Sequence, residues 1–203
     1  MRKYLVLLLL LFFIEFSFGQ SFNAGLLGGF TASQVSGDDY SGFNKLGFTF
    51  GAYTYLPLKN EKSNIGLEIF FIQKGSRHLP NTEKFDYTDY AIRLSYIEIP
   101  IIYTHQMPVN GLNLEIGSAY ARLISQKEVL NYVTFNNPFN DTEIDFIAGF
   151  KYAISERIDL GLRNYTTWFF SPIRAHSGAA KYRFNWGQYN TALSFSIRYN
   201  FAK

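Results

Sequence analysis

Apolar and polar side chains alternate one by one along most of the chain after residue 20. In the segment 111–124, Leu114 and Ile116 fall on one face, while Glu115 and Gly117 fall on the other. A period of two is typical of a β-strand whose two faces meet different surroundings. The pattern predicts strands at residues 22–33, 45–57, 64–77, 90–106, 111–124, 142–154, 158–170 and 188–201.

The predicted strands are long, and their connections differ in length. Soluble strands average about 5–6 residues, whereas a tilted strand that crosses a bilayer needs about 9–11. Long polar links alternate with tight turns, as in outer-membrane barrels with short periplasmic turns and longer external loops. We therefore predict an all-β fold, an eight-stranded antiparallel up-and-down transmembrane β-barrel. Its long links are 34–44, 78–89, 125–141 and 171–187, and its short ones are 58–63, 107–110 and 155–157.

A soluble ligand-binding barrel is the alternative fold. It would turn the apolar faces inward and leave polar-face residues such as Glu115 and Arg198 exposed to water. The fourth predicted strand, 90–106, is ambiguous in its facing. Ile99 and Ile101 look lipid-facing, but that register places the apolar Leu94 on the same side as Glu98, and Pro100 suggests a local bulge because proline cannot donate to the ladder.

The amino terminus has the pattern of a secretory signal peptide. Arg2 and Lys3 precede an apolar run over residues 4–14, and small residues, Ser17 and Gly19, follow it. The run is short for a spanning helix, which needs about 20 residues, although an uncleaved anchor is the alternative. We expect a signal peptide over 1–19, cleavage near Gly19/Gln20 and a single barrel domain over 20–203.

Composition narrows the class of protein. The 203-residue chain has 19% aromatic residues, no cysteine and a formal net charge of +3. The absence of cysteine excludes a disulfide framework and thiol chemistry. The small, dispersed basic excess gives no reason to expect a nucleic-acid partner. No second long apolar run follows the first, which excludes a helical membrane protein.

Several charged residues fall on the polar face of the predicted strands. Such charges are costly to bury unless they are paired and hydrogen-bonded. We therefore predict that Glu68, Glu98 and Glu115 pair with Arg163 and Arg198 and hold the barrel together from inside. A catalytic or proton-conducting role is the alternative. The predicted lumenal network comprises Glu68, Glu98, Glu115, Asp145, Lys151, Arg163 and Arg198.

Aromatic residues gather near the predicted strand ends, where membrane barrels carry aromatic girdles. The last strand ends with Tyr199 and Phe201 on one face, which is similar to the terminal signal that the barrel assembly machinery recognises. That machinery and outer-membrane lipid are therefore expected partners. The residues assigned to the girdles are Tyr103, Tyr120, Tyr152, Tyr165, Trp168, Tyr189 and Tyr199.

Short motifs in order along the mature chain resemble the PorT-like outer-membrane β-barrel domains of Bacteroidota. The resemblance implies an eight-stranded barrel in the cell outer membrane, and it implies no ligand or activity. The motifs are Gly28-Gly29-Phe30-Thr31-Ala32-Ser33, residues 36–43, Leu67-Glu68-Ile69, Gln73-Lys74-Gly75-Ser76, Leu94-Ser95-Tyr96-Ile97-Glu98-Ile99-Pro100, Glu115-Ile116-Gly117-Ser118 and Gly161-Leu162-Arg163.

The external loops carry the remaining candidate chemistry. His176 and Ser177, with Asp86 or Asp89 from another loop, would give a base and a nucleophile for an outer-leaflet lipid-modifying enzyme. The spacing requires no such site, and no metal-ligand or cofactor motif is present. We favour a non-enzymatic barrel with a structural role, or one that binds a protein or glycan through its loops. The candidate loop contacts are Tyr132, Phe135, Tyr182, Phe184 and Trp186.

Overall fold

The computed structural model describes residues 22–60, 62–175 and 187–201. The expected signal peptide lies outside the described residues. Within them, no helix is long and apolar enough to cross a membrane. The elements are β1 (Asn23–Ser36), β2 (Lys45–Pro57), β3 (Ser63–His78), the 3-10 turn η1 (Thr82–Lys84), β4 (Tyr90–Gln106), β5 (Leu112–Leu130), β6 (Val133–Phe135), β7 (Thr142–Ala153), β8 (Ile158–Thr167), β9 (Arg174–Ala175) and β10 (Gly187–Asn200).

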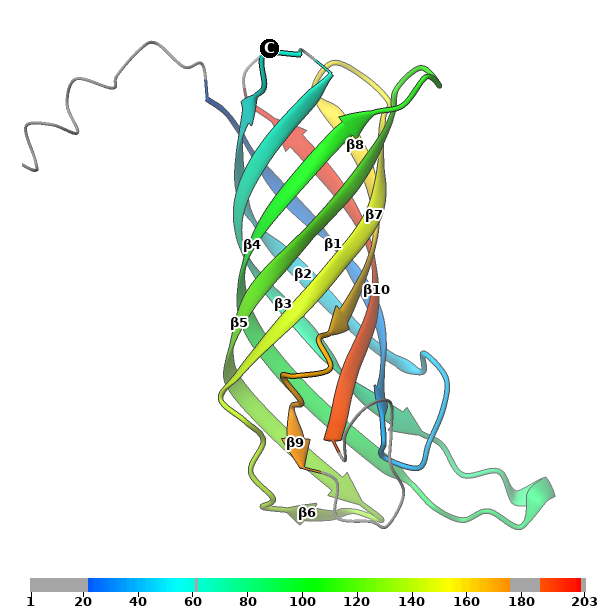
Figure 1. The fold of residues 1–203 in the computed structure, drawn as a ribbon. Helices are drawn as coiled ribbons and strands as arrows, with labels where there is room; N and C mark the ends of the chain where they lie inside the picture. Colours follow the sequence, from blue (N-terminus) through cyan, green and yellow to red (C-terminus); the bar gives the residue numbers. More distant parts are fainter. Residues whose placement is uncertain (1–21, 61, 176–186, 202–203) are drawn as a thin grey trace, which may run out of the picture.

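Eight strands form a closed antiparallel wall in the order β1-β2-β3-β4-β5-β7-β8-β10, and β10 pairs back onto β1 (Figure 1). The closing pairs run from Gly25↔Asn200 to Ser36↔Tyr189. Because the sheet closes, no strand of the wall has an unpaired edge. A strand in hydrocarbon requires this, since its backbone groups have no water to bind. The short β6 and β9 pair with β5 and β10 and stand outside this wall. The predicted eight-stranded up-and-down barrel is therefore confirmed.

The alternation of the sequence matches the two faces of the wall. On β1, Phe30 is exposed on the outer face, while Thr31 and Ser33 are buried. The same pattern on the other strands gives an outer belt of exposed apolar side chains, which suits contact with lipid. The inner face carries polar and charged side chains that fill the narrow lumen, as expected for a barrel of eight strands.

Long and short connections lie at opposite ends of the barrel. In Figure 1, β6, β9 and the extended β3–β4 loop lie at the lower end, and the carboxyl terminus lies at the upper end. The largest departure from the prediction concerns the link 125–141. There β5 continues to Leu130, and a two-residue turn leads into β6, where Val133 pairs with Leu130. Polar residues on both faces made this extension look like a loop.

Several side chains predicted from facing or strand ends are placed differently. Tyr165 is buried in the lumen beside Arg163, because both residues have the inward parity of β8. Tyr189 is also buried, and its hydroxyl donates to the carbonyl oxygen of Phe169 at 3.1 Å. Neither tyrosine therefore belongs to a girdle. On β4 the register shift lies between Ser95 and Tyr96, and the expected bulge at Pro100 is wrong, since Pro100 pairs with Ala119 in an unbroken β4–β5 register there.

The ambiguous facing of β4 also resolves. Ile99 and Ile101 are exposed on the outer face, whereas Glu98 and Leu94 are both buried inside. Leu94 belongs to a group of buried apolar side chains near the long-loop end of the lumen. Its members include Val35, Ile92, Leu94, Phe139 and Ile173.

Candidate functional site

Two glutamates and two arginines form an ion cluster in the lumen, the inner cluster: Glu68 on β3, Glu115 on β5, Arg163 on β8 and Arg198 on β10. Arg163 Nη1 lies 2.7 Å from Glu68 Oε2, and Arg163 Nε lies 2.7 Å from Glu115 Oε2. Arg198 contacts both glutamates as well, with 3.1 Å between its Nη1 and Glu115 Oε1. All four side chains are buried.

The charges of the inner cluster cancel, and most of its hydrogen-bonding groups are satisfied. The Arg163 guanidinium donates through Nε and Nη2 to Glu115 and through Nη1 and Nη2 to Glu68. Planar, two-pronged pairing of this kind is the strongest arrangement open to arginine and carboxylate. Closer to the short turns, Lys151 Nζ lies 3.7 Å from Asp159 Oδ2, a looser pair. These contacts make a cross-linked plug in the lumen.

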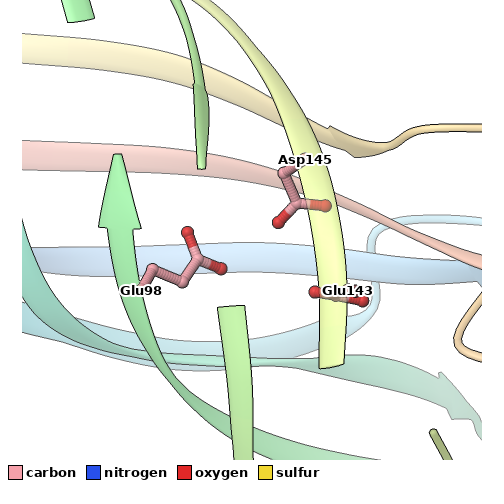
Figure 2. Close-up of side chains that lie close together, drawn as sticks. All are labelled: Glu98, Glu143 and Asp145. Atoms are coloured by element: carbon pink, nitrogen blue, oxygen red, sulfur yellow. The ribbon is translucent and has the colours of Figure 1, made fainter. Parts of the chain in front are cut away.

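A second buried cluster surrounds Lys74 on β3, the Lys74 cluster. Its ammonium lies 2.5 Å from Glu98 Oε1 and 2.7 Å from Glu143 Oε1, and it also contacts Asp145. Figure 2 shows Glu98 reaching from β4 toward Glu143 and Asp145 on β7. Three carboxylates and one ammonium have a formal net charge of −2, so this cluster, unlike the inner cluster, is not balanced by its own side chains.

The expectation that Glu98 pairs with the arginines is wrong. Register explains why: on β4 the partner of Glu115 is Thr104, whereas Glu98 lies six residues further along the strand. At about 3.3 Å per residue, Glu98 lies about 20 Å along β4 from the neighbour of Glu115, in the direction of the long loops. Glu98 instead pairs with Ala121, which pairs on its other side with Glu143. On its own other side, Glu98 pairs with Phe70, two residues from Glu68. Asp145, placed in one network with the arginines, also contacts Lys74.

Lys74 was missing from the predicted network. Its signal was present in the sequence, because Glu68 and Lys74 are six residues apart on one strand and therefore share a face. The carboxylates Glu98, Glu143 and Asp145 offer ligand atoms within 4.8 Å of one another, a spacing that could hold a metal ion. However, the Lys74 ammonium already contacts all three carboxylates. The cluster is therefore best described as an ammonium site.

A pocket of about 540 Å³ opens at the long-loop mouth of the barrel, the mouth pocket. Arg174 on β9 crosses to Glu128 on β5 through two hydrogen bonds of 2.7 and 3.1 Å, and its Nε donates to Gln188 at 3.1 Å. The Tyr90 hydroxyl donates to the same glutamate at 2.6 Å. Asp38, in the β1–β2 loop, also lines this pocket, and burial raises the pKa of its carboxyl group.

Two of the long loops are joined near their tips. The Asn131 backbone N–H donates to the carbonyl oxygen of Asp89 at 2.8 Å, and the Asp89 N–H donates to the Asn131 side chain at 2.9 Å. Of the predicted loop contacts, Tyr132 and Phe135 are exposed on this hairpin. The other three, Tyr182, Phe184 and Trp186, lie outside the described residues.

Asp86 and Asp89, the acids considered for acid–base chemistry in the loops, each contact a basic side chain. His78 Nε2 lies 2.6 Å from Asp86 Oδ2, and the Asp86 pKa is lowered by hydrogen bonds from the Thr88 backbone and from His78. Asp89 instead pairs with Arg77 at 2.8 Å. The structure as described places no serine hydroxyl in hydrogen-bonding contact with the His78 ring. His176 and Ser177 lie outside the described residues, so His78 has an orienting acid and no described nucleophile.

Comparison with known proteins agrees with this architecture. Neisserial surface protein A has a similar fold, with a TM-score of 0.51 and 15% sequence identity over 90% of this chain and 99% of that chain. Ail, the attachment invasion locus protein of Yersinia pestis, solved in complex with the heparin analogue sucrose octasulfate, gives a TM-score of 0.49 and 10% identity over 89% of this chain and 99% of that one. No curated protein matches the sequence.

The match at the level of the family is more extensive. The sequence profile of the outer membrane protein β-barrel domain matches residues 18–202, nearly the whole chain. This match agrees with the closed wall of eight strands and with its apolar outer belt. The chain therefore belongs to the outer membrane protein β-barrel domain family, and its location is the outer membrane.

Proposed function

We propose that this barrel is a non-enzymatic surface protein that binds an extracellular protein through the tips of its β3–β4 and β5–β6 loops. A plugged lumen supports a role outside the barrel, because the inner cluster and the Lys74 cluster fill it with ion-paired side chains. Function on rigid scaffolds usually resides in the loops.

The observation that carries the proposal concerns Phe85 and Tyr132. Both have positive φ angles, 55° and 68°, and both side chains are almost fully exposed, at 84% and 90%. A bulky residue in this backbone region is strained, and an exposed aromatic ring gains nothing from burial to offset the strain. Strain of this kind gathers at functional sites. We infer that the two rings are held ready for a partner.

The surroundings of the two loop tips also support a role of Phe85 and Tyr132 in binding a partner. Phe85 follows η1, where the Asn81 side chain accepts a hydrogen bond from the Lys84 N–H and Asn81 bridges to Asp86. The hydrogen bonds between Asp89 and Asn131 tie this loop to the Tyr132 turn. Ordering before binding reduces the entropy lost on association. Exposed aromatics on such a platform are suitable binding anchors.

Site-specific photo-crosslinking tests the proposal. A photoreactive phenylalanine analogue would replace Phe85 or Tyr132 in intact cells, with Lys59 in a short turn as the control position. We expect a discrete adduct from both tips and none from Lys59. The captured protein, once identified and purified, should then bind the Phe85→Ser/Tyr132→Ser variant at least about tenfold more weakly, as expected for anchor residues.

A second control uses Val109→Ser, which removes an exposed apolar side chain at the opposite end of the barrel. This variant should bind with unchanged affinity. Absence of adducts from both tips, or equal affinity of the tip variant and the parent protein, would show that the tips do not bind a partner.

We also propose that residues 1–19 are a cleaved signal peptide and that the aromatic last strand directs insertion by the barrel assembly machinery. The motifs quoted above support placement of the chain among the PorT-like outer-membrane β-barrel domains of Bacteroidota. Amino-terminal sequencing of the mature protein tests the first of these proposals, and a start at Gln20 or Ser21 is expected.

A further inference from the structure

The mouth pocket has an unbalanced set of charges. Its lining includes three acids, Asp38, Asp39 and Glu128, and one described base, Arg174. The formal net charge of these groups is therefore −2. A site with this charge repels phosphate, sulfate and other anions and attracts cations.

The one base is already engaged. Arg174 donates to both oxygens of Glu128 and to Gln188, and its guanidinium lies 4.2 Å from the centroid of the Phe139 ring. These contacts use most of its donors and fix its orientation. Arg174 therefore shapes the wall of the pocket and neutralises Glu128, and it does not supply a free positive group for a ligand.

The two remaining acids have no counter-ion among residues 22–60, 62–175 and 187–201. Asp38 is 7% exposed, and one of its oxygens accepts a hydrogen bond from the Tyr40 N–H at 3.1 Å. The other oxygen is buried and has no hydrogen-bond partner. A buried carboxylate oxygen that lacks a partner is costly. Asp39 is exposed beside it, at a φ angle of 68°.

Aromatic rings complete the wall. Tyr40 and Tyr90 both line the pocket, with their ring centroids 5.0 Å apart, and Tyr40 also stacks on His78 at 4.3 Å. The Tyr90 hydroxyl is fixed by its hydrogen bond to Glu128. Aromatic rings attract cations through their negative faces, and they also give apolar contact to an alkyl chain.

The spacing of the acids distinguishes an organic cation from a metal ion. Among the described residues, the group of acidic side chains close enough to share a metal ion is Glu98, Glu143 and Asp145 in the lumen. The carboxylates of the mouth pocket do not converge in that way. Spread charges and a volume of about 540 Å³ suit a molecule of several heavy atoms.

We propose that the mouth pocket binds the ammonium or guanidinium group of an organic cation, with Asp38 and Asp39 as its counter-ions and Tyr40 and Tyr90 as its apolar wall. This site is separate from the loop tips, and its ligand is independent of the partner proposed there. A free polyamine and a lysine or arginine side chain carry the same recognised group.

Isothermal titration calorimetry on the purified full-length barrel in detergent tests the proposal. The probes are spermidine, agmatine and a short lysine–arginine peptide, with glucose and sulfate as neutral and anionic comparisons. We expect binding of the cationic probes only, and weaker binding at high salt because salt screens partly exposed charges. Tighter binding of the peptide than of spermidine would indicate that the natural ligand is a lysine or arginine side chain of a protein. Tighter binding of spermidine would indicate a free polyamine.

Charge-neutral variants locate the site. Asp38→Asn/Asp39→Asn should weaken spermidine binding by about tenfold or more, on the scale of a partly desolvated charge pair. Asp141→Asn, which neutralises an exposed acid paired with Arg122 away from the pocket, should leave binding unchanged. If the double variant fails to fold, Asp39→Asn alone should still weaken binding severalfold, since Asp39 is exposed. Equal binding of glucose or sulfate, or equal losses in the Asp141 variant, would overturn the proposal.

Discussion

Arg163 on β8 reaches across the lumen to Glu68 on β3, 95 residues away in sequence, and their Nη1 and Oε2 atoms are 2.7 Å apart. The same guanidinium holds Glu115 on β5. One side chain therefore links three strands that share no direct pairing in the wall. The inner cluster therefore links opposite sides of the wall through the lumen. Removal of the Arg163 side chain should lower the stability of the whole barrel.

Arg163→Ala should destabilise the folded barrel strongly, because it leaves two buried glutamates with Arg198 as their remaining arginine. The expected loss in the free energy of unfolding is about 3–5 kcal/mol, as for a broken buried ion pair. Urea unfolding of the protein in lipid vesicles measures it. Arg122→Ala is the matched control, since Arg122 and Asp141 form an exposed pair, and such pairs contribute about 0–1 kcal/mol. Equal losses in the free energy of unfolding of the two variants would contradict a stabilising role of the inner cluster.

Lys74→Met should impair folding more than a single neutralised acid does, because it leaves three buried carboxylates without their shared ammonium. Adding Glu143→Gln and Asp145→Asn should restore a large part of the lost stability, since it removes two of the unpaired charges. A heat-modifiable band on a detergent gel reports the folded fraction. No rescue by the added substitutions would mean that charge balance does not govern this cluster.

Gly149→Ala tests the packing of the inner cluster. A Cβ at Gly149 would lie 2.4 Å from the carbonyl oxygen of Leu162 and 2.8 Å from Cγ of Arg163. Overpacking of this kind typically costs about 1–3 kcal/mol. Gly28→Ala is the control, because a Cβ there meets nothing within 4 Å and should change stability little. If Gly149→Ala lowers the stability no more than Gly28→Ala does, the backbone and side chains around Gly149 can shift to make room for the added Cβ.

Tyr132→Gly should raise stability while it weakens partner binding. The left-handed conformation costs a non-glycine residue about 1–2 kcal/mol, and Tyr132 has that conformation in a two-residue turn. Thr134→Gly on the neighbouring strand is the control and should lower stability, since glycine weakens strands. Equal effects of both substitutions on the unfolding midpoint would argue against strain at Tyr132.

The sequence predicted the wall well and the lumen only in part. Alternation marks which residues share a face, so the inward placement of Glu115 and Arg198 followed from parity alone. It does not give the height of a residue in the barrel, which depends on the stagger between strands. That is why the prediction pairs Glu98 with the arginines, although Glu98 lies six residues along β4 from Thr104, the partner of Glu115, and why Lys74 is missing from the predicted network.

Loop structure was harder to predict, for a different physical reason. Beyond the membrane both faces of a strand meet water, so the period of two disappears where β5 continues toward Glu128. The turn at Asn131 and Tyr132 also lacks the glycine that usually marks such a hairpin. The Arg174–Glu128 pair, which shapes the mouth pocket, joins residues 46 apart in sequence, and no local pattern indicates it.

We expect this outer-membrane barrel to present the β5–β6 hairpin outside the cell and its short turns in the periplasm. The chain has no cysteine, so single-cysteine variants can be labelled without background. Tyr132→Cys and Lys59→Cys would be exposed to a membrane-impermeant maleimide in intact cells and again after lysis. We predict that position 132 is labelled in intact cells and that position 59 is labelled only after lysis. Labelling of position 59 in intact cells, or protection of position 132, would contradict the orientation and the function proposed for the loops.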